Sequence, residues 1–496
     1  MRESRAPLVQ PARLGASTAE DHSTLNQRNT ALLALGWSVV VGLVVFALFR
    51  AHGFDDPFIT YRYSDNLARG LGFVYNPGER VLSTTTPLYT LLLIAPRLLG
   101  FDLPATSMAI SSAALAAGGL CLFLLGQRLH TPIAGLVAMV LYPLTPLLLP
   151  TLGAETTLYC ALILGGFWAY ASERPMLTAL LLALAALTRA DGVLAAGIVG
   201  LHLVLSRKRL PWRALALYVA LLAAWYLFAW VYFGSPLPAT LAAKQRQGAM
   251  LISSSFAQGL LAQAASYWSQ PLLRLHLIAA AVGAIYALGR RRGWLPLIAW
   301  GVIYTLAYSA LGVTRYFWYY GPIAPALFAL IGLGTEAVAA GLRPRSRWLA
   351  PVATIALGVA LLWPLAVRVP GMAATVDKRL AIYQATGEWL RDNTPVGASV
   401  GTLEVGVIGF YAERPMIDFA GLLQPEVARQ IGPTTTYGDL TAWAFTRYQP
   451  DYLVMRPPIP EQLAALPGFQ AGCTPVHQLT DPAFDGILVI YQCRDL

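Results

Sequence analysis

Long apolar runs alternate with short polar segments through most of this 496-residue chain. A run of about 20 apolar residues has the length of a helix that crosses a bilayer, and the sequence predicts eleven such helices. They are expected near residues 31–49, 104–126, 131–150, 155–172, 175–188, 191–205, 213–233, 271–289, 294–312, 316–340 and 348–366. The run 86–100 is shorter and contains Pro96 and Arg97, so we expect it to lie at the membrane interface. The pattern predicts a polytopic α-helical membrane protein.

Basic residues cluster between the predicted helices, at 206–213, 289–293 and 343–347, and in the N-terminal tail. Clusters of this kind favour the cytoplasmic side, which makes residues 1–30 a disordered cytoplasmic tail. The run 31–49 lacks an obvious small-residue cleavage site, so we interpret it as a true first helix and not a signal peptide. Eleven crossings of the cytoplasmic (inner) membrane then leave residues 370–496 on the extracytoplasmic side.

The region 370–496 is more polar and has a mixed pattern. It predicts a helix over 377–393, a short strand near 398–402, further apolar pieces near 415–419 and 451–455, and a last strand over 486–493. We therefore expect a small extracytoplasmic α/β domain. Cys473 and Cys493 both fall in it, and the sequence leaves open whether they pair as a disulfide.

The composition agrees with a membrane protein, since 56% of the residues are hydrophobic and only 12% are charged, against about 25% charged in soluble domains. The net charge of +10 comes almost wholly from arginine, because the only lysines are Lys208, Lys244 and Lys378. Short basic clusters between apolar runs indicate membrane topology. We therefore expect membrane lipids as partners, and no nucleic acid.

Two adjacent carboxylates, Asp55 and Asp56, open a long outer loop over 50–103. The sequence after them resembles the start of a helix, with Asp56 as N-cap and Pro57 at the first helical position. Asp56 is thus either a capping residue or a member of a coupled acid pair with Asp55. Asp55 is either a solvated loop acid or a general base facing a hydroxyl nucleophile.

Other polar residues of the predicted outer side are candidates for a substrate site. Tyr61 and Arg62 follow the two aspartates, and Arg62 could instead pair with Asp65 three residues on. Glu79 belongs to a turn and could be solvated.

Three further candidates lie at the predicted ends of membrane helices. Glu155 begins one of these helices, where it either stabilises the helix N-terminus or contacts a polar cavity. Arg189 and Asp191 flank a short turn and could satisfy each other. Ionisable residues near membrane depth commonly have functions.

Two outer cations suit a lipid-linked phosphate. Lys244 lies in the loop 234–248, and Arg315 precedes the aromatic run 316–320. Each either binds a phosphate or is attracted to anionic headgroups. The aromatic residues are interpreted first as an interfacial belt and second as sugar-stacking candidates.

The chain shows no metal-ligand spacing, Walker loop, Rossmann glycine pattern or nucleophile elbow. No cofactor is therefore predicted, although the sequence leaves a divalent cation open. A transferase without a nucleotide site would need a substrate whose activating group lies in the membrane.

Several segments together resemble one family. They are "DDPFITYRYSDNLARGLGFVYNPGERVLSTTTPLYTLLL" (55–93), "GAETTLY" (153–159), "LTRADG" (187–192), "GSPLPATLAAK" (234–244) and "VGVIGFYAERPMIDFAGLLQPEV" (405–427). The chain resembles GT-C-fold glycosyltransferases that use polyprenyl-phosphate sugars, and most closely the mycobacterial terminal β-(1→2)-arabinofuranosyltransferase family. The first segment is the specific one and the others are supportive.

This resemblance implies a GT-C-like catalytic domain over 31–369, with the domain 370–496 covering its cavity. It implies transfer of a sugar, such as arabinofuranose, from a polyprenyl-phosphate donor to a hydroxyl of a cell-envelope glycan or glycolipid, with inversion. Asp55 would be the base and Asp56 the second acid. A departing phosphate gains charge that nearby cations would stabilise, and the candidate phosphate-binding cations are Arg62, Lys244 and Arg315. The candidate substrate-binding residues are Tyr61, Glu79, Glu155, Arg189 and Asp191.

Two positions depart from the family pattern, since Ala239 stands where an asparagine is common and Ala190 where a proline is common. These departures concern the identity of the substrate and not the fold. A transporter or lipid flippase is the alternative function, but it would want polar residues near the bilayer midplane. A noncatalytic scaffold would not explain why Asp55, Arg62 and Lys244 share the outer edge.

Overall fold

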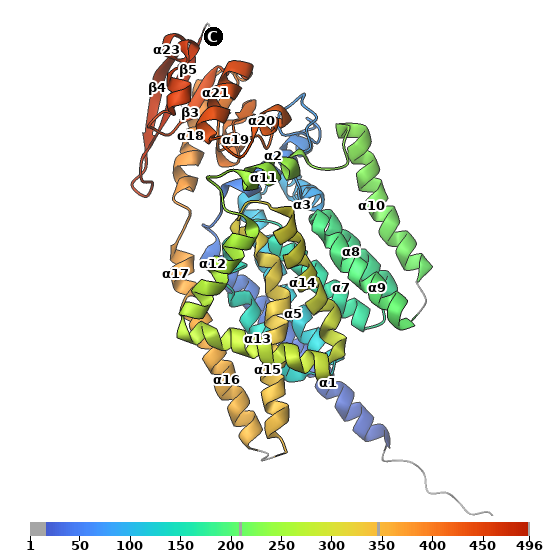
Figure 1. Ribbon diagram of the computed structural model, residues 1–496. Coiled ribbons are helices and arrows are strands. Elements are labelled where there is room, and N and C mark those ends of the chain that lie inside the picture. The colour runs from blue at the N-terminus through green and yellow to red at the C-terminus, as the bar shows by residue number, and fades with distance from the viewer. Residues whose placement is uncertain (1–15, 208–210, 345–347, 495–496) are drawn as a thin grey trace, which may run out of the picture.

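The computed structural model describes residues 16–207, 211–344 and 348–494. It has a helical bundle at one end and a small sheet domain at the other, with short helices at the junction (Figure 1). The bundle helices are α1 (Ala16–Phe49), α5 (Leu103–Arg128), α6 (Pro132–Leu141), α7 (Thr156–Ala171), α8 (Pro175–Thr188), α9 (Val193–Arg207), α10 (Trp212–Phe233), α13 (Pro271–Arg290), α14 (Leu295–Leu311), α15 (Ala324–Leu342) and α16 (Leu349–Ala366).

Within the described ranges, seven helical segments are long and apolar enough to cross a membrane, and five apolar segments are shorter. The chain is therefore a polytopic helical membrane protein, while the number of eleven crossings stays a prediction. The adjoining ends of α9 and α10, and of α15 and α16, lie away from the sheet domain (Figure 1). This arrangement is the one that the basic clusters predict, because those clusters flank the same helix ends.

Short helices connect the long ones, and several of them, such as α2 and α11, lie at the end of the bundle that faces the sheet domain (Figure 1). They are α2 (Asp55–Ala68), α3 (Pro87–Leu92), α4 (Ile94–Leu98), α11 (Ala239–Ala249), α12 (Phe256–Ser269) and α17 (Val369–Ala374). The segment 86–100, expected at the interface, forms α3 and α4, which pack on α2. Two such short helices cannot span a bilayer.

The C-terminal domain contains one five-stranded sheet in the order β2-β1-β3-β5-β4. Its strands are β1 (Val400–Thr402), β2 (Met416–Asp418), β3 (Tyr452–Met455), β4 (Cys473–Thr480) and β5 (Ile487–Cys493). β1 is parallel to β2 and β3, whereas β5 is antiparallel to β3 and β4. Its helices are α18 (Arg379–Asn393), α19 (Val407–Ala412), α20 (Pro425–Gln430), α21 (Tyr437–Tyr448), α22 (Glu461–Ala464) and α23 (Pro467–Gly472).

The predicted α/β character of this region is confirmed. β1 and β5 coincide with the two predicted strands, and β2 and β3 coincide with the two apolar pieces. β4 was not predicted; it is a largely exposed edge strand whose pairing shifts register between Pro475 and His477. Cys473 and Cys493 pair in register at its start and form a disulfide.

Both faces of the sheet are covered, because successive side chains of a strand point to opposite faces. Val454 packs in a cluster that includes residues of α2, such as Phe58 and Tyr61. Its neighbours Leu453 and Met455 face a second cluster built with α21. One face of the sheet domain therefore shares its core with the first outer loop, which fixes the domain on the bundle.

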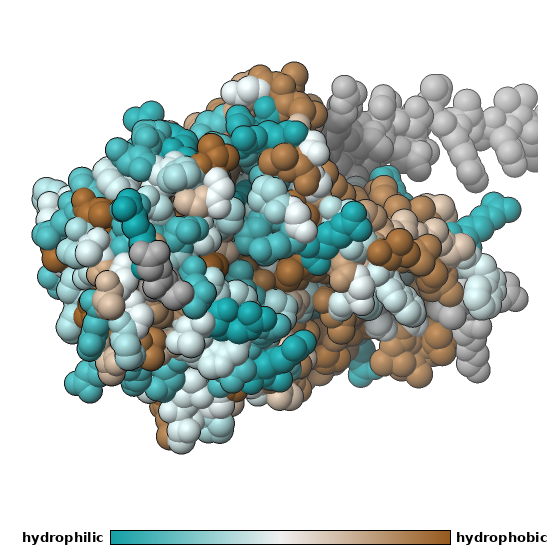
Figure 2. All heavy atoms as spheres, turned by 90° about the horizontal axis from the view of Figure 1, so that it is seen from above, coloured by the Kyte–Doolittle hydropathy of each residue, from teal (hydrophilic) through white to brown (hydrophobic). Residues whose placement is uncertain are grey.

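The outer surfaces of the sheet domain and of the helical bundle differ in hydropathy. Viewed from the side of the sheet domain, hydrophilic residues predominate over the domain, and hydrophobic residues gather beyond it over the helices (Figure 2). Exposed apolar side chains follow α10 in particular, among them Trp212, Val219, Leu227, Trp230 and Val231. An apolar face of this extent is typical of a surface that contacts lipid.

Candidate functional site

A cavity of about 160 Å³ lies at the end of the bundle beneath the sheet domain. Its walls come from α2, the start of α7, the turn between α8 and α9, α11 and the aromatic run after α14. The charged residues that line it are Asp56, Glu155, Arg189, Asp191 and Lys244. Four segments of the chain that are far apart in sequence thus bring their charges to one place.

The first pair in the cavity wall joins α2 to α11. Lys244 Nζ donates to Asp56 Oδ2 at 2.9 Å. The Lys244 side chain is 11% exposed and that of Asp56 is 30% exposed, so the carboxylate keeps access to the cavity while the ammonium is enclosed.

Aromatic rings enclose the ammonium on its other sides. Lys244 Nζ lies 5.2 Å from the ring centre of Tyr316, 5.3 Å from that of Trp318 and 5.9 Å from that of Tyr319. These separations are within the range of cation–π attraction. Burial lowers the pKa of Lys244, but Asp56 and the tyrosines outweigh burial and raise it above its usual value. Lys244 therefore stays charged at neutral pH.

The second charged group is a network behind the first pair. Arg189 Nη1 donates to Glu155 Oε1 at 3.1 Å, and Arg189 Nη2 donates to Asp191 Oδ2 at 3.0 Å. Tyr308 accepts from Arg189 Nη2 and donates to Asp191 Oδ2. Arg189 is held by two carboxylates, so its position is fixed by hydrogen bonds on both sides.

Three polar atoms around this cavity have no hydrogen-bond partner among the described residues. They are Asp191 Oδ1, Thr156 Oγ1 and Thr240 Oγ1, all buried atoms of cavity-lining residues. Buried polar atoms are nearly always paired. The cavity is therefore equipped to accept hydrogen bonds from a polyhydroxylated molecule, or to donate hydrogen bonds to it.

Asp55 lies next to Asp56 but belongs to a different environment. Its Oδ2 accepts from the backbone amide of Gly406 at 2.9 Å and its Oδ1 from that of Val407 at 2.8 Å. Burial raises the pKa of Asp55 to about 6, and the charge of Asp56 adds to that effect. Asp55 is not among the residues that line the cavity; it anchors the start of α19 to α2.

The predicted capping role of Asp56 is wrong. α2 begins one residue earlier, at Asp55, and its N-cap is Phe54, which makes no side-chain cap. Both aspartates therefore lie in the first turn of the helix. Pro57 follows them within that turn, where its missing N–H removes no helical hydrogen bond.

Arg62 was expected at the phosphate, but in the structure it bonds the C-terminal domain. It is 4% exposed, and its guanidinium donates to the backbone carbonyls of Tyr75, Gly409 and Arg414. It also stacks at 4.4 Å from the ring centre of Tyr75. The alternative pairing with Asp65 does not form either. The Arg62 guanidinium is bonded to these carbonyls, so Arg62 links α2 to the domain and is not among the residues that line the cavity.

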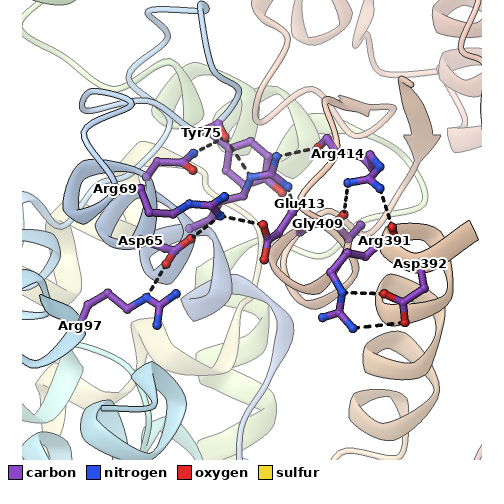
Figure 3. A network of polar contacts seen from close by, with 12 residues as sticks. Asp65, Arg69, Tyr75, Arg97, Arg391, Asp392, Gly409, Glu413 and Arg414 are labelled. Atoms are coloured by element: carbon purple, nitrogen blue, oxygen red, sulfur yellow. Dashed lines mark hydrogen bonds and ion pairs between the residues drawn. The ribbon is translucent and has the colours of Figure 1, made fainter. Parts of the chain in front are cut away.

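Asp65 instead bonds two other arginines of the first loop, Arg97 and Arg69, and Arg69 also reaches Glu413 of the C-terminal domain (Figure 3). The distance from Arg97 Nε to Asp65 Oδ1 is 2.5 Å. This network forms a second polar connection between the bundle and the domain.

Three more predicted site residues lie off the cavity. The buried hydroxyl of Tyr61 donates to the carbonyl of Gly153. Glu79 is exposed and accepts from Asn76 at 3.0 Å. Arg315 is exposed, and only its backbone is bonded to the segment before α12, through Ser254 at 2.9 Å. Helical or loop spacing alone could not show which way these side chains point.

Several lining residues escaped the sequence analysis. They include Thr85, Thr86, Thr156, Thr240 and Tyr308. The run of three threonines before Pro87 is an unusual sequence feature and could have served as a signal. Trp318 and Tyr319, interpreted first as interfacial belt residues, also line the cavity, which favours their second interpretation. Among the described residues, no group of three or more His, Cys, Asp or Glu side chains could hold a metal ion.

Comparison with known proteins defines the fold. A family model described as "Domain of unknown function (DUF8728)" matches residues 374–491. No curated protein matches the chain.

Solved structures match over nearly the whole chain. ArnT from Cupriavidus metallidurans bound to undecaprenyl phosphate is 13% identical, with a TM-score of 0.59, and the match covers 93% of this chain and 98% of ArnT. The apo state of the same protein gives 14% identity and a TM-score of 0.61, with 94% and 98% covered. The archaeal oligosaccharyltransferase AglB from Archaeoglobus fulgidus, in complex with an inhibitory peptide and a dolichol-phosphate, gives 13% identity and a TM-score of 0.57, with 85% and 69% covered. The chain thus has the GT-C fold, with a C-terminal α/β domain.

Proposed function

We propose that this chain is a membrane glycosyltransferase that moves a sugar from a polyprenyl-phosphate donor to an acceptor hydroxyl. The Lys244–Asp56 pair in the wall of the cavity carries the proposal, because it places a cation for phosphate beside a carboxylate for a hydroxyl proton. The fold supports it, since proteins of the same fold have been captured with undecaprenyl phosphate and with a dolichol-phosphate.

The structure changes which aspartate we propose as the base. Asp56 faces the cavity, so we assign to it the removal of the acceptor proton. Asp55, engaged by two backbone amides of the C-terminal domain, is a positioning residue that holds the first turn of α2. Attack by the acceptor oxygen opposite the departing phosphate inverts the anomeric carbon, and Lys244 stabilises the charge gained by that phosphate.

The sugar and the acceptor follow from the resemblance of the first loop to arabinofuranosyltransferases. We propose arabinofuranose as the first sugar to test and a cell-envelope glycan or glycolipid as acceptor, on the extracytoplasmic side of the inner membrane. Asp191, Thr156 and Thr240 would bind the sugar hydroxyls through their unpaired atoms. Tyr319 and Trp318 offer ring faces for its apolar side.

The test is transfer of radiolabelled sugar from a panel of polyprenyl-phosphate sugars, in membranes that carry wild type, Asp56→Asn or Asp55→Asn. The two substitutions are adjacent and isosteric, so each serves as the control for the other. We expect wild type to transfer from one donor, Asp56→Asn to lose at least about 100-fold of the rate, and Asp55→Asn to keep a larger share of it. Samples treated with a chelator show whether a divalent cation is required.

Three outcomes would change the proposal. Loss of transfer in Asp55→Asn with a normal rate in Asp56→Asn reverses the assignment of the base. Equal rates in all three proteins remove both aspartates from the chemistry. If wild type transfers from none of the donors, the glycosyltransferase proposal fails and movement of lipid across vesicles becomes the next assay.

A further inference from the structure

The cations of the cavity differ in how much they are already neutralised. Among the described residues that line it there are two cations, Arg189 and Lys244, and three carboxylates. Arg189 is held between Glu155 and Asp191, whereas the carboxylate paired with Lys244 is Asp56. The lining therefore carries a formal charge of −1 by these five residues, and an entering phosphate meets no free cation.

We propose that the donor phosphate takes Lys244 away from Asp56, so that the enzyme's base is released only when the donor is bound. This inference rests on the proposed function, and concerns the regulation of the same site. In the state without donor, the Lys244–Asp56 ion pair holds the carboxylate oxygen that would accept the proton. In the donor-bound state, the phosphate oxygen replaces that carboxylate as the partner of Nζ.

The surroundings of Lys244 make such an exchange of partners feasible. The ammonium is held by the rings of Tyr316, Trp318 and Tyr319, whose attraction does not depend on Asp56. The Lys244 side chain is the more buried member of the pair and Asp56 the more exposed. The carboxylate can therefore leave the pair toward the cavity and be solvated there, while the lysine remains in place.

The exchange of partners at Lys244 comes before the chemical step. The acceptor oxygen forms the new bond to the anomeric carbon, the bond from that carbon to the phosphate oxygen breaks, and its electron pair stays with the phosphate. The acceptor proton goes to Asp56, and the polyprenyl phosphate leaves with one more negative charge, which Lys244 faces. Without donor, Asp56 Oδ2 stays paired with Lys244.

The test measures binding and not transfer. Undecaprenyl phosphate, the type of product that the step releases, is titrated into wild type, Asp56→Asn, Lys244→Met and the double variant in nanodiscs. Asp56→Asn should bind it about tenfold more tightly than wild type, because no charged hydrogen bond to Lys244 has to be broken. In the Lys244→Met background the same substitution should change affinity by less than about twofold.

The outcomes separate the inference from the proposed function. If wild type binds but Asp56→Asn is not tighter, the exchange is refuted while the donor class stands. If Asp56→Asn is tighter by the same factor with and without Lys244, general charge repulsion is the cause and the exchange is again refuted. If wild type does not bind undecaprenyl phosphate, both the exchange and the proposed donor class fail.

Discussion

A single methyl group at Gly409 should loosen the C-terminal domain from the bundle. Gly409 lies in α19 where the helix meets the first loop, and an alanine methyl there would collide with the hydroxyl of Tyr75. It would also lie 3.1 Å from Met416 Cγ and 3.2 Å from Arg62 Nη1. Tyr75 is buried, and its hydroxyl donates to the carbonyl of Val405, so it has little room to move.

The expected cost follows from these contacts. Overpacking of a buried site costs about 1–3 kcal/mol, and a strained bond from Arg62 to the Gly409 carbonyl about 1.5 kcal/mol more. Alanine in place of glycine in a helix returns about 0.5–1 kcal/mol. The net loss is about 3 kcal/mol, which corresponds to about 100-fold in the equilibrium between docked and undocked domain.

Hydrogen exchange of backbone amides in detergent micelles measures this equilibrium directly. The amides of Gly406 and Val407 donate to Asp55 in the docked domain, so their protection reports opening of this contact. Gly409→Ala should lower that protection about 100-fold. Gly397→Ala is the matched control, because an added methyl there meets nothing within 4 Å.

Two results would refute the reasoning. Protection of the Gly406 and Val407 amides that stays within about threefold of wild type in Gly409→Ala would show that α19 accommodates the methyl. A similar loss in Gly397→Ala would show that the effect is a general response to alanine and not a local collision.

Two further predictions concern the stability of the C-terminal domain. Burial raises the pKa of Asp418 from 3.8 to about 6. The contribution of this group to the free energy of unfolding is therefore complete below pH 3.8 and is lost as the pH rises through about 6. From this group alone, wild type should be about 1.4 kcal/mol less stable at pH 8 than at pH 5. Denaturant titrations at the two pH values should show a loss of stability that is about 1.4 kcal/mol smaller in Asp418→Asn than in wild type, and an equal loss in both would contradict the assignment. The Cys473–Cys493 disulfide has a sequence separation of 20, so Cys473→Ser should cost about 3 kcal/mol. Reductant should lower the unfolding midpoint of wild type but not of this variant, and a midpoint that reductant leaves unchanged in wild type would argue against the bond.

The sequence predicted the class of fold because its signals are local. Apolar runs and basic clusters predict membrane helices without knowledge of distant contacts, and the short apolar runs at 451–455 and 486–493 coincide with two inner strands. β4 carries no such pattern, since an exposed edge strand has only one neighbour and few buried side chains. The number of crossings remained open because several apolar helices are shorter than a bilayer is thick.

The candidate site was predictable where the chain segment itself faces the cavity. Glu155, Arg189, Asp191 and Lys244 lie at helix ends or in short connecting helices on the predicted outer side, and the structure brings all four together. Arg62 was not predictable, because its partners are backbone carbonyls, two of them more than 340 residues away.

The two aspartates show the same limit more sharply. Asp55 and Asp56 are adjacent and have identical chemistry, but a helix turns by about 100° per residue, so their side chains point in different directions. One reaches the C-terminal domain and the other reaches the cavity. The position of α2 between the C-terminal domain and the cavity decides which aspartate faces the domain and which faces the cavity.

The way in which α2 holds the C-terminal domain has a consequence for how such a protein can diverge. Asp55 binds backbone amides, and Arg62 binds backbone carbonyls. Asn76 likewise donates to, and accepts from, the backbone of Met416. Backbone groups are the same for almost any side chain, so these contacts constrain the path of the docked segment more than its residues. The exposed surface of the domain is therefore free to change in evolution, or by grafting, while its attachment to the helical bundle is preserved.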